Sequence, residues 1–538
     1  MNIMGSISET EAARFLLRAQ FGTSEAEIAA VRAQGYDAWL EAQFATPRGQ
    51  SGIDWLDAHG HNAVAKDVKY FDPTAGNYMI WNQLIGQPDQ MRQRCAFALS
   101  QFTVVSLNPI DGFWPPYMLA GWWDVLLEGA FGNFRDLLER VTLNPAMGMY
   151  LNTKGNLKED LKTGRQPDEN YAREVMQLFT IGLYELNPDG TDKKGADGKP
   201  IETYGQDDVM NLARVFTGYD HNMDRVKYQT VAWQTYPVVS HEFCVDPMKL
   251  DPKKHSQLEV RFLGLTIPAG TPGPDALKLA LDHLFAHPNV GPFFARQMIQ
   301  RMVASNPSPA YVGRVAAAFN DNGRGNDNGK GVRGDLKAVW RAVLTDPEAL
   351  VPPANPLANP LGGKLREPVL RVLGWARTCG MHSDNGAYEI YSTERADEGL
   401  GQMPLKSPSV FNFYRPGYAP PHTEIAKAGL VAPEFQIETE TSLAGYINFL
   451  QWSLRWGYKD VKPTYVSLRA IAHDTPAVVA WLNLHLSGNQ LSDATCALIA
   501  AALASKNVTA ASSDSDKLDM IAAACLLVMS APEYLVQK

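Results

Sequence analysis

Apolar residues recur along most of the chain with the period of an α-helix. In residues 89–105 they lie three or four positions apart and form a single stripe. Ser24, followed three residues later by Glu27, is a capping box and predicts a helix over residues 25–34. The same period predicts helices over residues 11–20, 36–44, 121–129, 134–143, 207–216, 274–285, 290–304, 310–320, 335–344, 367–377, 440–454, 475–486, 493–504 and 515–529.

Signals for β-strands are few and are concentrated in one region. Turn-forming residues within 186–200, followed by a short β-prone run at 201–204, predict a small hairpin between helices. The β-branched and aromatic run at 226–239 predicts one or two further strands. We therefore expect a small β insertion at about residues 186–240. We also expect an irregular loop, rich in proline and aromatic residues, at about residues 401–421.

The predicted helices follow one another too closely to belong to independent domains. A length of 538 residues would by itself allow about three domains. However, no long linker interrupts the chain, and no repeat with the period of a solenoid is present. We therefore predict a mainly α fold, with one large multi-helix domain over residues 1–538 and a small β-hairpin insertion.

The composition is that of a large acidic globular protein and argues against several classes of function. The chain has 49 Lys and Arg against 58 Asp and Glu, a net charge of −9, which argues against nucleic-acid binding through clustered cations. Its five cysteines are far apart, so zinc ribbons and disulfide scaffolds lose support. The sequence has no phosphate-binding loop and no run of about 18 apolar residues. We expect no membrane span, no organic cofactor and no metal site.

One predicted helix carries polar residues beside its apolar stripe. Pro167 and Asp168 are typical of a helix start, with Asp168 as the N-cap. Tyr171, Val175 and Leu178 form the apolar stripe. Polar groups next to such a stripe need partners or a ligand if they are buried. Here the polar face consists of Asn170, Arg173, Glu174 and Gln177.

Two interpretations of this polar face stay open. In the first, Glu174 is a general acid or base in a cleft, and burial and Arg173 set its pKa. Asn170 and Arg173 would then bind a hydroxylated or anionic substrate. In the second, the same side chains form a buried polar network that fixes the packing of the helix.

Two residues outside this helix are further candidates. His255 follows two lysines in a predicted loop, and its ordinary pKa suits proton transfer. The alternative is a solvated surface histidine. Asp208 lies at the start of the helix predicted at 207–216, where it either binds substrate or caps the helix.

Aromatic residues gather in two places that suit the binding of sugar rings. Asn412, Tyr414 and Arg415 lie in the irregular loop at 401–421 and either bind substrate or pack that loop onto the helices. A second group either forms a carbohydrate platform or belongs to the core, namely Trp114, Tyr117, Trp122 and Trp123.

Several segments match a known family pattern. The longest, 165–182, contains the block Asp-Glu-Asn-Tyr-Ala-Arg-Glu. The others are 91–101, 133–147, 207–218, 287–301 and 407–417. On these motifs the chain closely resembles the bacterial family called "domain of unknown function 1800" (DUF1800), from about residue 13 to the C-terminus. Many members have His at the place of Phe179 and His-Asp where this chain has His255-Ser256.

The resemblance implies a bacterial protein, commonly exported, whose gene often lies beside that of a sulfatase-like protein. It implies no established activity. We therefore expect a periplasmic or secreted protein. The N-terminus lacks the charged and apolar regions of a signal peptide, so a cytoplasmic location stays the alternative.

Together these features predict a carbohydrate-active enzyme that acts on a polyhydroxylated polymer. A glycoside hydrolase would need two carboxylates across the scissile bond. Glu174 with either Asp168 or Asp208 would supply them.

A polysaccharide lyase is the second form of this hypothesis. It would use Tyr171 or His255 as the base, while Asn170 and Arg173 neutralise the carboxylate of a uronate. A non-catalytic role stays open as well. In that role the protein would assist export or surface assembly as a partner of the sulfatase-like protein.

Overall fold

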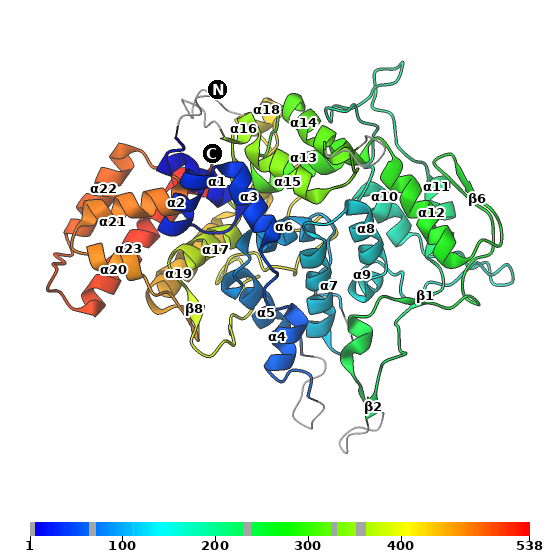
Figure 1. Cartoon of the computed structure of the whole chain (residues 1–538), viewed down its shortest axis with the longest axis horizontal. Coiled ribbons are helices and arrows are strands. Elements are labelled where there is room, and N and C mark those ends of the chain that lie inside the picture. The colour runs from blue at the N-terminus through cyan, green and yellow to red at the C-terminus, as the bar shows by residue number, and fades with distance from the viewer. Residues whose placement is uncertain (1–5, 64–71, 111, 230–237, 324–330, 351–361) are drawn as a thin grey trace.

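The structure, a computed structural model, describes residues 6–63, 72–110, 112–229, 238–323, 331–350 and 362–538. Within these residues the fold is mainly α, as predicted, and the strands form short antiparallel pairs. Figure 1 shows the N-terminal helices beside the C-terminal ones, with the middle of the chain on the opposite side. Thr23 joins these ends, since its hydroxyl donates to the carbonyl of His485 at 3.0 Å.

The N-terminal part is a succession of helices, and α2 is capped by Ser24 as the sequence indicates, although the reciprocal half of the predicted capping box is not formed. The hydroxyl of Ser24 accepts from the backbone N–H of Glu27, and the helix ends at Gly35 with φ of 81°. The helices are α1 (Glu9–Ala19), α2 (Glu25–Gln34), α3 (Tyr36–Ala45), α4 (Gly52–Ala58), α5 (Thr74–Trp81), α6 (Gln90–Ser100), α7 (Pro115–Gly129), α8 (Phe134–Thr142) and α9 (Pro145–Tyr150). A π-helical turn, Asn82–Gly86, extends α5.

The prediction for α6 is too long, because the helix stops at Ser100 rather than near residue 105. The side-chain amide of Gln101 donates to the buried carboxylate of Glu367 at 2.8 Å. The N–H of Leu107 then donates to the carbonyl of Leu405 at 2.9 Å. These tertiary bonds draw the chain out of the helix although its residues stay buried.

The middle of the chain contains the β insertion and a second group of helices. The helices are α10 (Asn170–Gln177), α11 (Gln206–Ala213), α12 (Gly273–Ala286), α13 (Val290–Met302), α14 (Pro309–Asn320), α15 (Leu336–Thr345) and α16 (Pro347–Leu350). Antiparallel pairs join β1 (Tyr219–Asp220) to β4 (Lys249–Leu250), β2 (Tyr228–Gln229) to β3 (Val238–Val239) and β5 (Val260–Phe262) to β6 (Leu265–Ile267).

The predicted β insertion is present, but it differs in detail. The hairpin expected within 186–204 consists of isolated bridges such as Tyr184 with Glu202. Part of the predicted 226–239 strand region, residues 230–237, lies outside the described residues. The hairpin β5–β6 lies beyond the predicted insertion and turns at Leu263 and Gly264, which both have positive φ. Leucine is an unusual residue for such a turn, so the sequence gives little signal for it.

The C-terminal part is again helical, and the end of the chain pairs with a short strand that precedes α17. The helices are α17 (Pro368–Thr378), α18 (Glu424–Lys427), α19 (Glu440–Trp456), α20 (Val466–Ile471), α21 (Thr475–Leu482), α22 (Asp493–Ala504), α23 (Asp514–Ser530) and α24 (Pro532–Leu535). Strand β7 (Lys364–Leu365) pairs with β10 (Val536–Gln537), and β8 (His382–Ser383) pairs with β9 (Val461–Lys462). Residues 401–421 contain no helix or strand, as expected.

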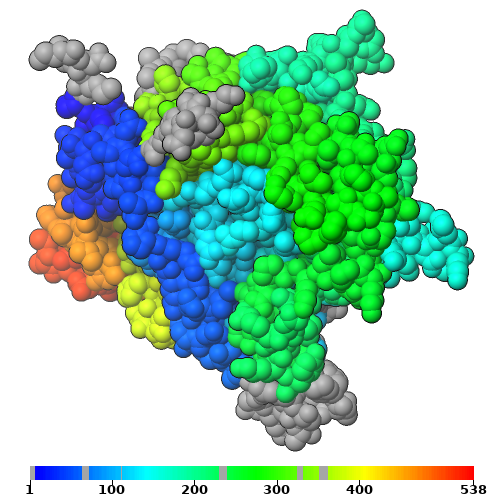
Figure 2. Space-filling view, turned by 45° about the vertical axis from the view of Figure 1, so that its right-hand side comes forward, coloured from blue at the N-terminus to red at the C-terminus, as the bar shows by residue number. Residues whose placement is uncertain are grey.

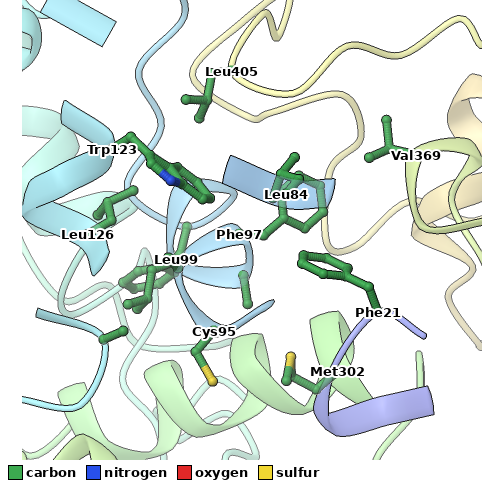
Figure 3. Close-up of a cluster of buried hydrophobic side chains, with 14 of the residues drawn as sticks. Phe21, Leu84, Cys95, Phe97, Leu99, Trp123, Leu126, Met302, Val369 and Leu405 are labelled. Atoms are coloured by element: carbon green, nitrogen blue, oxygen red, sulfur yellow. The ribbon is translucent and has the colours of Figure 1, made fainter. Parts of the chain in front are cut away.

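The core lies around α6 and α7, which contact each other along one side. Buried apolar residues from Ala12 to Tyr534 belong to one hydrophobic cluster. Figure 3 shows Cys95, Phe97 and Leu99 of α6 within this cluster. They lie among side chains from α7, α13, α17 and the irregular loop. In Figure 2 the cyan segment with α7 to α9 lies between the blue N-terminal helices and the green middle of the chain.

The aromatic group at the start of α7 belongs to this core. Tyr117, Trp122 and Trp123 are fully buried, and Trp114 is nearly so. The core alternative therefore holds, and the carbohydrate platform does not. Among the described helices, none combines the length and the apolar character needed to cross a lipid bilayer.

Candidate functional site

Helix α10 begins one residue later than predicted, and Asp168 stabilises its start. Glu169 is the N-cap residue. The carboxylate of Asp168 accepts from the backbone N–H of Asn170 at 2.8 Å. Asn156 holds the backbone of Asp168 on both sides, accepting from its N–H at 2.9 Å and donating to its carbonyl at 3.2 Å. Asp168 is exposed and orients the start of the helix, which explains its place as the first residue of the Asp-Glu-Asn-Tyr-Ala-Arg-Glu block.

Glu174 lies on the polar face of α10 but is only 8% exposed. Its carboxyl forms no hydrogen bond with any described residue, and the buried Oε2 has no partner. Burial raises the pKa of Glu174, and the charge of Arg173 opposes this only in part. A buried carboxyl with a raised pKa and free oxygens is typical of a functional site.

Two tyrosines from other segments lie within electrostatic reach of this carboxyl. Tyr150, the last residue of α9, interacts with the hydroxyl of Ser407 in the irregular loop. Burial raises the pKa of Tyr150 to about 12, and the charge of Glu174 adds to this. Tyr204 is half-buried and donates to the side-chain oxygen of Gln177 at 2.9 Å. Burial raises the pKa of Tyr204 as well; the charge of Arg173 opposes this shift, and the charge of Glu174 adds to it.

We call Glu174, Arg173, Tyr150, Tyr204 and Ser407 the Glu174 cluster. Arg173 forms its more exposed side. Its guanidinium donates to Glu169 at 3.2 Å and to Gln206 at 3.0 Å, so it is oriented while part of it stays open to solvent. The neighbouring Asn170 is half-buried. The cluster therefore combines a protonatable carboxyl, phenols that keep their protons and a cation.

Tyr171 belongs to the core and not to this cluster. Its hydroxyl donates to the hydroxyl of Thr142 at 2.7 Å, and its ring packs at right angles against Phe216. Burial raises the pKa of Tyr171 far above its ordinary value. Tyr171 therefore does not fit the predicted role of catalytic base, because its phenol is sealed from any substrate and keeps its proton.

Replacing Tyr171 by Phe should lower the free energy of unfolding by about 1 kcal/mol, because one hydrogen bond between buried side chains is lost. Substrate turnover should stay unchanged. Chemical unfolding and activity measured on the same sample check this. A variant that is as stable as the wild type but inactive would return Tyr171 to the catalytic group.

His255 is buried rather than solvated, and it lies in a different cluster. Its Nδ1 is 2.9 Å from the carbonyl oxygen of Thr217. The neighbouring Ser256 donates to the carboxylate of Glu159 at 2.8 Å. No contact of His255 joins it to the Glu174 cluster within the described chain. His255 fixes the turn before β5. Its burial and its place outside the Glu174 cluster argue against the predicted role as a base.

Asp208 caps α11 and supports the β5–β6 hairpin. One carboxylate oxygen accepts from the N–H of Gly205 at 2.8 Å, and the other accepts from the N–H of Leu263 at 2.8 Å. Both oxygens are thus engaged with the backbone. The capping alternative explains this residue, and a substrate-binding role does not.

The three candidates from the irregular loop have three different environments. Tyr414 is buried and donates to Glu367 at 2.9 Å, so it anchors the loop to the core. Asn412 is buried with φ of 63°, and its side-chain N–H₂ has no partner among the described residues. Arg415 is exposed and lies over the ring of Phe411 at 4.9 Å. None of them joins the Glu174 cluster, although Ser407 of the same loop does.

A family model described as "Protein of unknown function (DUF1800)" matches residues 14–536. The chain belongs to the DUF1800 family. The match includes α10 and every residue of the Glu174 cluster, and it confirms the resemblance found in the sequence motifs. No curated protein and no solved structure matches the chain.

The tyrosines and the serine of this DUF1800 site were missed from the sequence. Tyr150 follows the motif at 133–147 by three residues, and Ser407 begins the motif at 407–417. Their closeness to family motifs is the one signal that pointed to them. In the described ranges no three His, Cys, Asp or Glu side chains are grouped closely enough to bind a metal ion.

Proposed function

We propose that this DUF1800 protein is a carbohydrate-active enzyme in which Glu174 transfers the proton. The observation that carries the proposal is the buried carboxyl of Glu174, which has no hydrogen-bond partner among the described residues and has a raised pKa. Burial makes the ionised carboxylate a stronger base and keeps the neutral acid populated to higher pH than for an ordinary glutamate. The expected location in the periplasm or outside the cell suits a polymeric substrate.

The surroundings of Glu174 favour elimination over hydrolysis. Hydrolysis needs a second carboxylate across the scissile bond. Asp208 is bound to two backbone amides, Asp168 orients the start of α10 and Glu169 pairs with Arg173. Elimination needs only one base, one acid and a cation that neutralises the uronate carboxylate.

The proposed reaction uses three members of the cluster. Arg173 binds the carboxylate of a uronate, which acidifies the neighbouring C–H. The Glu174 carboxylate removes that proton, the bond to the leaving sugar oxygen breaks, and a carbon–carbon double bond forms. Tyr150 gives its proton to the leaving oxygen. Its raised pKa keeps this phenol protonated until the transfer.

The test is an assay of the full chain on uronate polymers (alginate, polygalacturonate, hyaluronate) and neutral ones (dextran, cellulose). Elimination creates new reducing ends together with the ultraviolet absorbance of an unsaturated uronate. We expect both signals on one of the uronate polymers. New reducing ends without that absorbance would replace the lyase by a hydrolase, and cleavage of no polymer would contradict the enzyme proposal.

A further inference from the structure

A groove of about 590 Å³ lies where α13 meets several loops of the middle and C-terminal parts. Its walls are mainly apolar and include Leu183, Leu430 and Val431, with prolines along the loops. The volume falls in the range of pockets that enclose small organic ligands. No member of the Glu174 cluster lines it, so it is a separate site.

Gln300, which lines this groove, has a buried acceptor without a partner among the described residues. The side chain is 8% exposed. Its amide N–H₂ donates to the carbonyls of Ser305 at 3.0 Å and Pro416 at 3.3 Å, which both belong to the groove. Since both hydrogens are engaged, the amide cannot turn over, and Oε1 keeps its position without a partner in the described structure. A buried acceptor of this kind calls for an N–H or O–H donor.

Arg296 supplies a cation at the same groove. It lies one helical turn before Gln300 on α13, so both side chains are on one face of the helix. Arg296 is exposed, and its charge helps to lower the pKa of Asp189, although no acidic side chain of the described residues forms an ion pair with it. Asp192 also lines the groove but is not paired with this arginine. Asp189 is not part of the groove lining. A guanidinium beside apolar walls that forms no ion pair with the described residues suits a carboxylate ligand.

We propose that this groove binds a small amphipathic acid that carries an N–H donor next to its carboxylate, as an N-acyl amino acid does. The carboxylate pairs with Arg296, the amide N–H donates to Oε1 of Gln300, and the apolar side chain packs against Leu183 and Val431. This inference needs no catalysis and does not depend on the proposed lyase activity.

The test compares three related compounds by titration calorimetry on the full chain. N-acetyl-phenylalanine has both polar groups, its primary amide lacks the charge, and 3-phenylpropionate lacks the N–H. We expect N-acetyl-phenylalanine to bind at least about tenfold more tightly than either of the others, since each lacks one hydrogen bond to a buried or charged group. Equal binding of the three compounds, or no binding of any, would overturn the proposal.

Arg296→Met should remove the preference for the acid over its amide, and the exposed position of Arg296 leaves the fold intact. Arg261→Met is the matched control, because Arg261 is exposed and lies outside the groove. Leu183→Ala should weaken the binding of all three compounds to the same extent. Unchanged preference for the acid in Arg296→Met would contradict the site.

Tighter binding of an acetylated tripeptide with the same C-terminal residue would show that the groove binds the C-terminus of a peptide and not a small acid. Glu174→Gln should bind as the wild type does, which separates this site from the catalytic proposal.

Discussion

Glu174→Gln should lower kcat/KM for the cleaved polymer by about 10²–10⁴-fold, the usual contribution of a positioned proton-transfer group. Glutamine has the size of the neutral carboxylic acid but neither takes nor gives the proton. The effect should therefore lie in kcat rather than in KM. The fold should tolerate the change, because the buried side chain that it replaces forms no hydrogen bond with any residue in the described ranges.

Glu169→Gln is the matched control for this variant. Glu169 is the N-cap residue of the same helix and pairs with Arg173, but its side chain is more exposed than that of Glu174. We expect it to lose less than about tenfold, as a group that orients a charge without transferring the proton. Equal losses in the two variants, or full activity of Glu174→Gln, would remove Glu174 from the reaction.

Glu434→Ala should lower the free energy of unfolding by about 3–5 kcal/mol, because it leaves a buried ammonium without its counter-ion. Glu434 and Lys364 lie 2.9 Å apart, and both side chains are almost fully buried. The ammonium also donates to the carbonyl of Arg301 at 3.0 Å. Burial raises the pKa of Glu434, and Lys364 opposes that shift.

The double variant Lys364→Met with Glu434→Leu is the control for this prediction. Replacing both charges by apolar side chains of similar size should recover most of the lost stability. Thermal and chemical unfolding of the single and double variants measure the coupling. A single variant that costs less than about 1 kcal/mol would show that water or another group already satisfies the lysine.

The sequence predicted the helices well wherever local signals decide their ends. Both α2 and α22 have the predicted bounds, since a serine caps each start. The end of α6 could not be predicted, because it depends on bonds from Gln101 and Leu107 to residues far along the chain. The β5–β6 hairpin was missed because its turn uses leucine where asparagine or aspartate is usual.

The candidate site was predictable only in its helix. Residue types and spacing placed Glu174 and Arg173 together on α10, and the structure confirms that placement. Tyr171 is buried, as its place on the apolar stripe predicts, and this argues against its role as a base. His255 lies in a loop, where periodicity gives no information, so its burial could not be predicted. Tyr150 and Ser407 come from other segments, and only tertiary packing brings them to α10.

The proton of Glu174 is central to the proposed chemistry, and the pH dependence of stability reports on it without knowledge of a substrate. The raised pKa of Glu174 means that the folded protein keeps a proton that the unfolded chain releases. Stability from this group is therefore present below its ordinary pKa and is lost as the pH rises through the raised value.

Wild type and Glu174→Gln should be compared by chemical unfolding from mildly acidic to mildly alkaline pH. We predict that the variant gains stability relative to the wild type as the pH rises above the ordinary glutamate range, and that the difference then levels off above the raised pKa. A difference that stays constant with pH, or that changes in the opposite direction, would contradict a raised pKa for Glu174 and with it the proposed chemistry.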